Sequence, residues 1–119
     1  MNLEAFDFQP LRGGFLLVKI VVNAEPMFDA MGRSALARTS IVGANITIEL
    51  AATALTPEQI SISIYHEVLE AATVAALHPP GAVCDLNEGG FESAAHTAHT
   101  EIGPASPENL NRMLERFGF

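Results

Sequence analysis

Residues 56–72 read Thr-Pro-Glu-Gln-Ile-Ser-Ile-Ser-Ile-Tyr-His-Glu-Val-Leu-Glu-Ala-Ala. The stretch begins with the signals of a helix N-terminus. Thr56 can accept a hydrogen bond from the backbone N–H three residues on, Gln59 can reach back to Thr56, and Pro57 stands where a missing N–H is not needed. Isoleucine, valine and alanine then recur at helical spacing. The pattern predicts a helix from Pro57 to about Leu77, ended by the His-Pro-Pro-Gly run that follows.

Three residues of this predicted helix have the chemistry of a metal site. His66 and Glu70 are four positions apart, so their side chains lie on one face about one turn from each other. Glu67 projects beside them. Two ligands at this spacing, with a carboxylate between them that can accept a proton from water, are the pattern of a metal-binding helix in hydrolases.

The hexapeptide His66-Glu67-Val68-Leu69-Glu70-Ala71 resembles the H-E-x-x-H-A core of the zincin metallopeptidases, with glutamate in place of the second histidine. The strand expected at 45–50, followed by a loop and the helix, is similar to the order found in small zincins. The resemblance covers residues 41–77 and, more loosely, the next helix. It implies a divalent-metal site holding zinc, with iron or manganese as alternatives, a peptide or small-molecule substrate, and Glu67 as the general base.

A third ligand is expected from a later helix, because catalytic metals are usually held by three protein groups. In the thermolysin-like zincins this ligand is a glutamate, and an acidic residue one turn further supports the first histidine. The helix expected at 90–102 carries Glu92 and His96 four residues apart. Either can complete the site: Glu92 adds a carboxylate, whereas His96 gives a set of two histidines and one carboxylate, in which Glu92 is a fourth ligand or orients a ligand. The chemistry of the donors favours His96, but the spacing does not decide. The two alternatives stay open at the level of sequence.

The remainder of the chain predicts a single α+β domain over residues 1–119. Its expected elements are a loosely structured lead at 1–13, strands at 14–23, 38–42 and 45–50, a helix at 24–36, and helices at 90–102 and from Pro107 onward. The prediction is a small, mostly antiparallel sheet packed against the metal-binding helix and two further C-terminal helices. Strand 45–50 is expected to have a free edge that could pair with an extended peptide.

Composition excludes several classes of function. The formal charge is −8, and no lysine or arginine occurs between Arg38 and Arg112, an interval with nine acids and all four histidines. Such a surface repels a phosphate backbone, so nucleic-acid binding is not expected. No apolar run reaches the ~20 residues of a membrane helix. A single cysteine, Cys84, forms no internal disulfide, and a cytoplasmic location is expected.

A second interpretation of the same residues is a zincin-like scaffold without catalysis, acting as a binding module or oligomer subunit. The replacement of histidine by Glu70 favours it. A peptidase also needs a donor for the oxyanion of its transition state, and His78 and His99 are the residues that the sequence offers.

Overall fold

The computed structural model describes residues 2–25, 27–28, 31–32, 34–51 and 55–119, and these form an α+β fold. The elements in chain order are η1 (Leu3–Phe6), β1 (Gln9–Leu11), β2 (Phe15–Asn23), β3 (Met27–Phe28), β4 (Ser34–Ala35), β5 (Ala37–Val42), β6 (Asn45–Ala51), α1 (Pro57–Ala75), α2 (Gly81–Cys84), α3 (Glu88–Glu101) and α4 (Pro107–Arg116). The predicted fold class, strands first and helices second, is confirmed.

The main sheet has four strands in the order β1-β2-β6-β5. The outer pairs β1/β2 and β5/β6 are antiparallel, and the central pair β2/β6 is parallel. The sheet is therefore mixed but mostly antiparallel, as predicted. Strand β6 pairs on both sides, so the free edge predicted for residues 45–50 is wrong. Among the described strands of this sheet, the two edges are β1, which pairs with β2 alone, and β5, which pairs with β6 alone.

One hydrogen bond just before β5 identifies which of its residues bond to β6. The backbone N–H of Ala51 donates to the carbonyl of Leu36 at 2.8 Å. In an antiparallel ladder the bonded residues alternate, and the register pairs Arg38 with Glu49 and Ser40 with Thr47. Residues 38, 40 and 42 therefore direct their N–H and C=O groups toward β6, and residues 37, 39 and 41 direct theirs toward the open edge.

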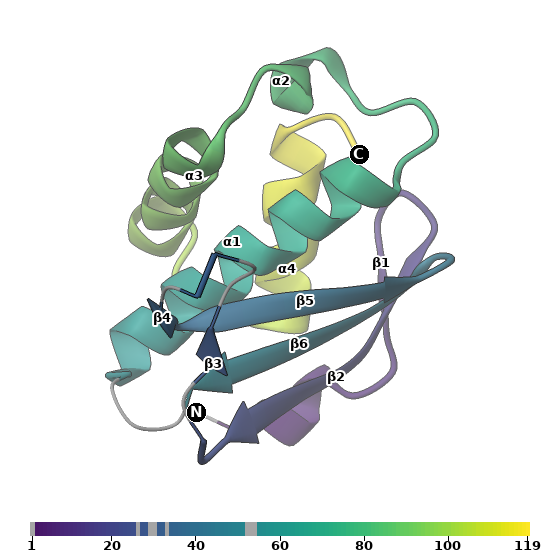
Figure 1. Cartoon of the computed structure of the whole chain (residues 1–119). Coiled ribbons are helices and arrows are strands. Elements are labelled where there is room, and N and C mark those ends of the chain that lie inside the picture. Colours follow the sequence, from purple (N-terminus) through teal and green to yellow (C-terminus); the bar gives the residue numbers. More distant parts are fainter. Residues whose placement is uncertain (1, 26, 29–30, 33, 52–54) are drawn as a thin grey trace.

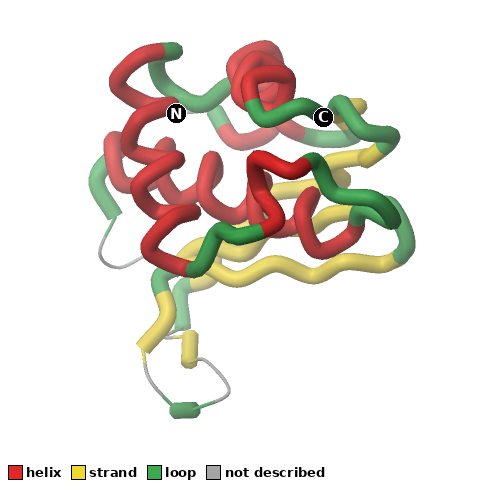
Figure 2. Tube along the Cα trace, turned by 90° about the horizontal axis from the view of Figure 1, so that it is seen from above, coloured by secondary structure: helices red, strands yellow, loops and turns green. Residues whose placement is uncertain are grey.

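The helices cover one face of the sheet (Figures 1 and 2). The core-facing residues of β6, Ile46, Ile48 and Leu50, are fully buried and share one hydrophobic cluster with Ile64 and Val68 of α1. Helix α3 packs on α1. Helix α4 is hydrogen-bonded to β1 and the turn after it. Asn111 accepts from the backbone N–H of Arg12 at 2.8 Å and donates to the carbonyl of Pro10 at 3.3 Å.

Two predictions for the N-terminal part are wrong. The described residues of 24–36 do not form a helix: β3 and β4 pair as a small antiparallel arm that extends from the body of the protein (Figure 2), and Gly32 has φ +78. The predicted loose lead instead contains η1 and β1, whose Phe6 and Leu11 are buried in the core. The parts of the predicted 24–36 helix at 26, 29–30 and 33 lie outside the described residues.

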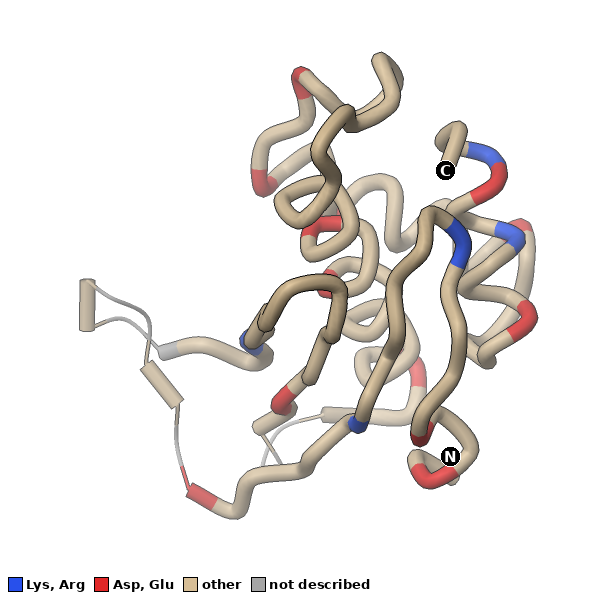
Figure 3. The backbone as a smooth tube through the Cα atoms, turned by 90° about the vertical axis from the view of Figure 1, so that its right-hand side faces the viewer, with Lys and Arg blue, Asp and Glu red and all other residues tan. Residues whose placement is uncertain are grey.

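The charged positions are unevenly distributed over the fold. Acidic positions occur on all the longer helices, and the few basic positions lie mainly on the strands and on the C-terminal helix (Figure 3). None of the helices in the described part of the chain is long and apolar enough to cross a membrane.

Candidate metal centre

Helix α1 carries three side chains into a cleft between β5 and the start of α3. The helix begins as predicted: Thr56 accepts from the N–H of Gln59 at 3.2 Å, and the Gln59 side chain accepts from the N–H of Thr56 at 2.9 Å. With the apolar side of α1 fixed on the sheet, His66, Glu67 and Glu70 face the cleft. His66 is almost fully buried, with 8% of the residue exposed, and both glutamates are half-buried.

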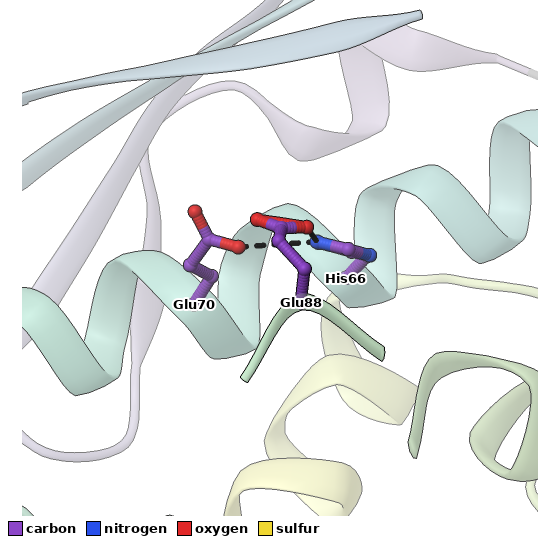
Figure 4. Close-up of side chains that lie close together, drawn as sticks. All are labelled: His66, Glu70 and Glu88. Atoms are coloured by element: carbon purple, nitrogen blue, oxygen red, sulfur yellow. Dashed lines mark hydrogen bonds and ion pairs between the residues drawn. The ribbon is translucent and has the colours of Figure 1, made fainter. Parts of the chain in front are cut away.

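Three donor atoms converge at the centre of this cleft (Figure 4). The Nε2 atom of His66 lies 3.1 Å from a carboxylate oxygen of Glu70 and 3.0 Å from a carboxylate oxygen of Glu88, the first residue of α3. Among the described residues, these ligand atoms all lie within 4.8 Å of one another. One imidazole nitrogen and two carboxylates supply both the donors and the negative charge that suit one divalent cation. His66, Glu70 and Glu88 therefore form a candidate metal site.

Glu92 contacts the other side of the same imidazole. Its Oε2 atom lies 2.6 Å from Nδ1 of His66, and its Oε1 atom lies 3.2 Å from Nε2 of His96. When a cation replaces the proton at Nε2, the carboxylate at Nδ1 would keep the other ring proton on Nδ1 and direct the lone pair of Nε2 toward Glu70 and Glu88. The predicted residues are thus connected by a chain of contacts: His96 contacts Glu92, and Glu92 contacts His66.

The charges of the cleft favour positive charge at its centre. Burial alone would lower the pKa of His66, but the hydrogen bond to Glu92 and the nearby carboxylates outweigh burial, so this pKa is raised. Burial, followed by the hydrogen bond with Glu88, raises the pKa of Glu70 to about 7. A carboxyl group with this pKa is partly protonated at neutral pH, and a cation would take the place of that proton.

Glu67 has a separate partner. Its Oε2 atom accepts a hydrogen bond from the hydroxyl of Thr39 on β5 at 2.6 Å. Burial raises the pKa of Glu67, and the hydrogen bond from Thr39 opposes that shift. The carboxylate lies on the wall of a cleft of about 700 Å³, to which β5, α1 and α3 contribute residues. The cleft also borders Arg38, whose guanidinium group is paired with Glu49 at 3.0 Å.

His99, Tyr65 and His78 do not border this cleft. Nδ1 of His99 is 2.8 Å from the hydroxyl of the buried Ser61, which also accepts from the backbone N–H of Ala105. Tyr65 is fully buried, and its hydroxyl donates to the carbonyl of Gly103 at 2.7 Å. His78 follows the C-terminus of α1 and borders a different hollow, next to Phe119.

Glu88 is the residue that the sequence analysis missed, although a signal for it exists. It follows the helix cap Asn87, whose side chain accepts from the N–H of Gly90 at 2.8 Å. Glu88 and Glu92 are four residues apart, which is the glutamate-then-acid spacing that the thermolysin-like zincins lead one to look for. The pair predicted from the sequence, Glu92 and His96, lies one turn later on the same helix.

Comparisons were made with models of protein families, with curated proteins and with solved structures. None of the three found a match to this chain. The geometry of the cleft is therefore the basis for a proposed function.

Proposed function

We propose that this protein binds one divalent cation through His66 Nε2, Glu70 and Glu88, and uses it to hydrolyse a peptide bond. The observation that carries the proposal is the pair of contacts on one imidazole ring: Nδ1 is held by Glu92, and Nε2 faces two carboxylates. Three protein ligands are the usual number in catalytic zinc sites. Zinc is the proposed cation. A set with one nitrogen donor also suits manganese and iron, which belong in the same test.

The proposed catalytic role of Glu67 follows from its position beside the ligands. A bound divalent cation would act as a Lewis acid toward water and toward the substrate carbonyl. Glu67 would accept the proton of the attacking water at its carboxylate and deliver it to the leaving amine nitrogen. Burial supports this role, because it raises the pKa of the Glu67 carboxyl and so makes the group a better proton acceptor near neutral pH.

An extended peptide is the substrate class that the surrounding backbone favours. The N–H and C=O groups of residues 37, 39 and 41 point away from β6, and Ala37, Thr39 and Ile41 border the cleft that holds the three ligands. A peptide that paired with this edge would gain backbone hydrogen bonds. Its carbonyl groups would lie next to Glu67 and the metal site.

A non-catalytic metal-binding module is the second candidate function. The two histidines considered as oxyanion donors lie elsewhere: His99 contacts Ser61, and His78 borders a different hollow. Removing one such donor from a hydrolase typically lowers kcat by about 10²–10³-fold. A chain without one would bind a cation and a peptide but turn over slowly.

Metal analysis of the purified protein tests the proposal. We expect about one equivalent of zinc, manganese or iron per chain, lost in His66→Ala and kept in His78→Ala, the matched histidine outside the cleft. Glu88→Gln should release the metal as His66→Ala does. Glu92→Gln, which removes only the partner of Nδ1, should weaken binding by about 10–100-fold. Equal metal content in wild type and His66→Ala would refute the site.

Glu67→Gln separates the two candidate functions. If the protein is a hydrolase, this variant should keep its metal and lose the cleavage of a mixed peptide library, because only the proton acceptor is removed. If the wild-type protein retains peptides without cutting them, and Glu67→Gln retains them equally, the non-catalytic function holds.

A further inference from the structure

We infer that Thr39 is a positioning residue whose hydroxyl holds the Glu67 carboxylate away from the metal ligands, where it is free to accept a proton. The inference depends on the proposed metal centre. It explains how a fourth carboxylate can border the site without becoming one of its ligands.

The crowding of carboxylates is the first observation. Glu70, Glu88 and Glu92 each have an oxygen within 3.1 Å of a ring nitrogen of His66. Glu67 is the residue next to His66 and borders the same cleft. Among the described residues, however, the donor atoms that converge within 4.8 Å do not include those of Glu67. Its Oε2 atom is instead 2.6 Å from the hydroxyl of Thr39.

The rigidity of Thr39 is the second observation. Its neighbours Arg38 and Ser40 pair with Glu49 and Thr47 of β6, so the backbone on either side is fixed in the sheet. The side chain is β-branched, which restricts its χ1 rotamers. The hydroxyl is therefore held by β5, whereas Glu67 has three rotatable side-chain bonds. A hydrogen bond between a fixed donor and a flexible carboxylate sets the position of the carboxylate.

The consequence concerns the coordination of the cation. A carboxylate one residue from a metal ligand would be drawn to a divalent cation unless another contact retained it. If Glu67 became a ligand, the cation would be bound more tightly, but a position for water or substrate would be occupied. We expect the contact with Thr39 to keep that position accessible, at the expense of metal affinity.

Cobalt(II) is the probe for the test, because its visible absorption reports its ligands, and azide reports a position open to exogenous ligands. The full chain, stripped of metal, is titrated with Co²⁺ and then with azide in wild type, Thr39→Val and Thr39→Ser. Thr39→Val keeps the branched shape and removes the hydroxyl. It should bind Co²⁺ about tenfold more tightly, with a changed spectrum and a weakened azide response. Thr39→Ser, which keeps the hydroxyl, should behave as wild type does.

Two further variants keep the inference open to refutation. Adding Glu67→Gln to Thr39→Val should restore the azide response and the wild-type affinity. Glu67→Gln alone should leave Co²⁺ affinity unchanged, and a tenfold loss would show that Glu67 is already a ligand and would overturn the inference even if Thr39→Val failed to fold. An unchanged spectrum and azide response in folded Thr39→Val would overturn the role of Thr39 alone. Failure of wild type to bind Co²⁺ would overturn the metal centre and, with it, this inference.

Discussion

The imidazole of His66 has different partners at its two nitrogens, and this arrangement decides what the residue can do. A histidine with a carboxylate at Nδ1 is oriented and made more basic at Nε2. The ring is nearly buried, and Phe91 lies beside it with ring centroids 6.2 Å apart. A free histidine on a helix surface would sample several rotamers, whereas this one is fixed by Glu92 and by its neighbours on α3. The lone pair of Nε2 therefore has a single direction.

The pKa of Glu70 gives a prediction about stability in the absence of metal. A carboxyl group whose pKa is about 7 in the folded protein, against an ordinary 4.5, binds more protons folded than unfolded between these two values. The contribution of this group to the free energy of unfolding is fully present below pH 4.5 and is lost as the pH rises through 7. Glu70→Gln should remove this loss. With EDTA at pH 8 the variant should be more stable by roughly 1–2 kcal/mol, a figure reduced because the side chain is one-third exposed.

Urea denaturation at pH 5 and at pH 8 measures this effect. In Glu70→Gln the free energy of unfolding should still fall somewhat between pH 5 and pH 8. The pKa of His66 is also raised, so the contribution of His66 to stability likewise falls as the pH rises. Glu115→Gln, on the exposed side of α4, is the matched control and should leave the slope unchanged. A slope that is equal in wild type and Glu70→Gln would show that Glu70 does not hold a proton in the folded protein.

At the scale of elements, the beginning of α3 decides which glutamate reaches the site. Glu88 enters the cleft because α3 begins at that residue, directly after the Asn87 cap. The next two residues, Gly89 and Gly90, are poor helix formers, which favours a later start when propensity alone is considered. The cap and the packing of α3 on α1 override that preference. Because the predicted helix began two residues later than α3 does, Glu88 was not among the candidate ligands predicted from the sequence.

Proline substitutions in β5 can distinguish the backbone groups that bond to β6 from those that face the open edge. Ile41→Pro removes an N–H that faces the open edge, and Ser40→Pro removes one that donates to β6. Ile41→Pro should therefore fold and should lose most peptide binding. Ser40→Pro should be more destabilised, by roughly 2–3 kcal/mol relative to Ile41→Pro, through the lost ladder bond and the strain of proline in a paired strand.

The measurements for this pair are the free energy of unfolding and the retention of a peptide library on immobilised protein. Ile41→Ala serves as a control for the loss of the isoleucine side chain, which is half-buried against the core. If Ile41→Pro bound peptides as Ile41→Ala does, the open edge of β5 would not be the site of pairing.

At the scale of the whole molecule, a bound cation should be linked to folding. Because the ligands come from α1 and α3, the site exists only in the folded chain, and zinc at 100 times its Kd should add about 2.7 kcal/mol of stability. The corresponding rise in Tm is roughly 10 °C. The rise should be larger at pH 8 than at pH 6, since the cation competes with protons on His66 and Glu70, whose pKa values are raised.

Thermal unfolding with and without zinc, followed by circular dichroism, measures this linkage. His66→Ala should lose the rise, and His78→Ala should keep it. An equal rise in both variants would indicate binding of zinc to other acidic groups of this highly charged chain.

Local sequence signals predicted most of the fold. The errors occur where contacts between residues far apart in the sequence determine the structure. The capped helix α1, the alternating β6 and the Ser106-Pro107 start of α4 are visible in short windows and were predicted. The apolar residues between 24 and 36 resemble a helix stripe only in approximate spacing. They form a strand arm instead, since Met27 pairs with Ala35. Which strand is at the edge of the sheet could not be read from β6 alone, because it depends on where β2 and β5 pair.

The parallel pairing of β2 with β6 also determines how the chain must fold. Strands β5 and β6 are joined by a short turn at Gly43, which has φ +62, so this hairpin is expected to form within microseconds. Leu17 must then find Ile46 across the closure of a long loop, a slower step. During that interval the hairpin has two unpaired edges, and one of them is the edge of β6, whose Ile46, Ile48 and Leu50 are buried in the native core. Refolding at high protein concentration should therefore favour aggregation through β6, and dilution should recover the native fold.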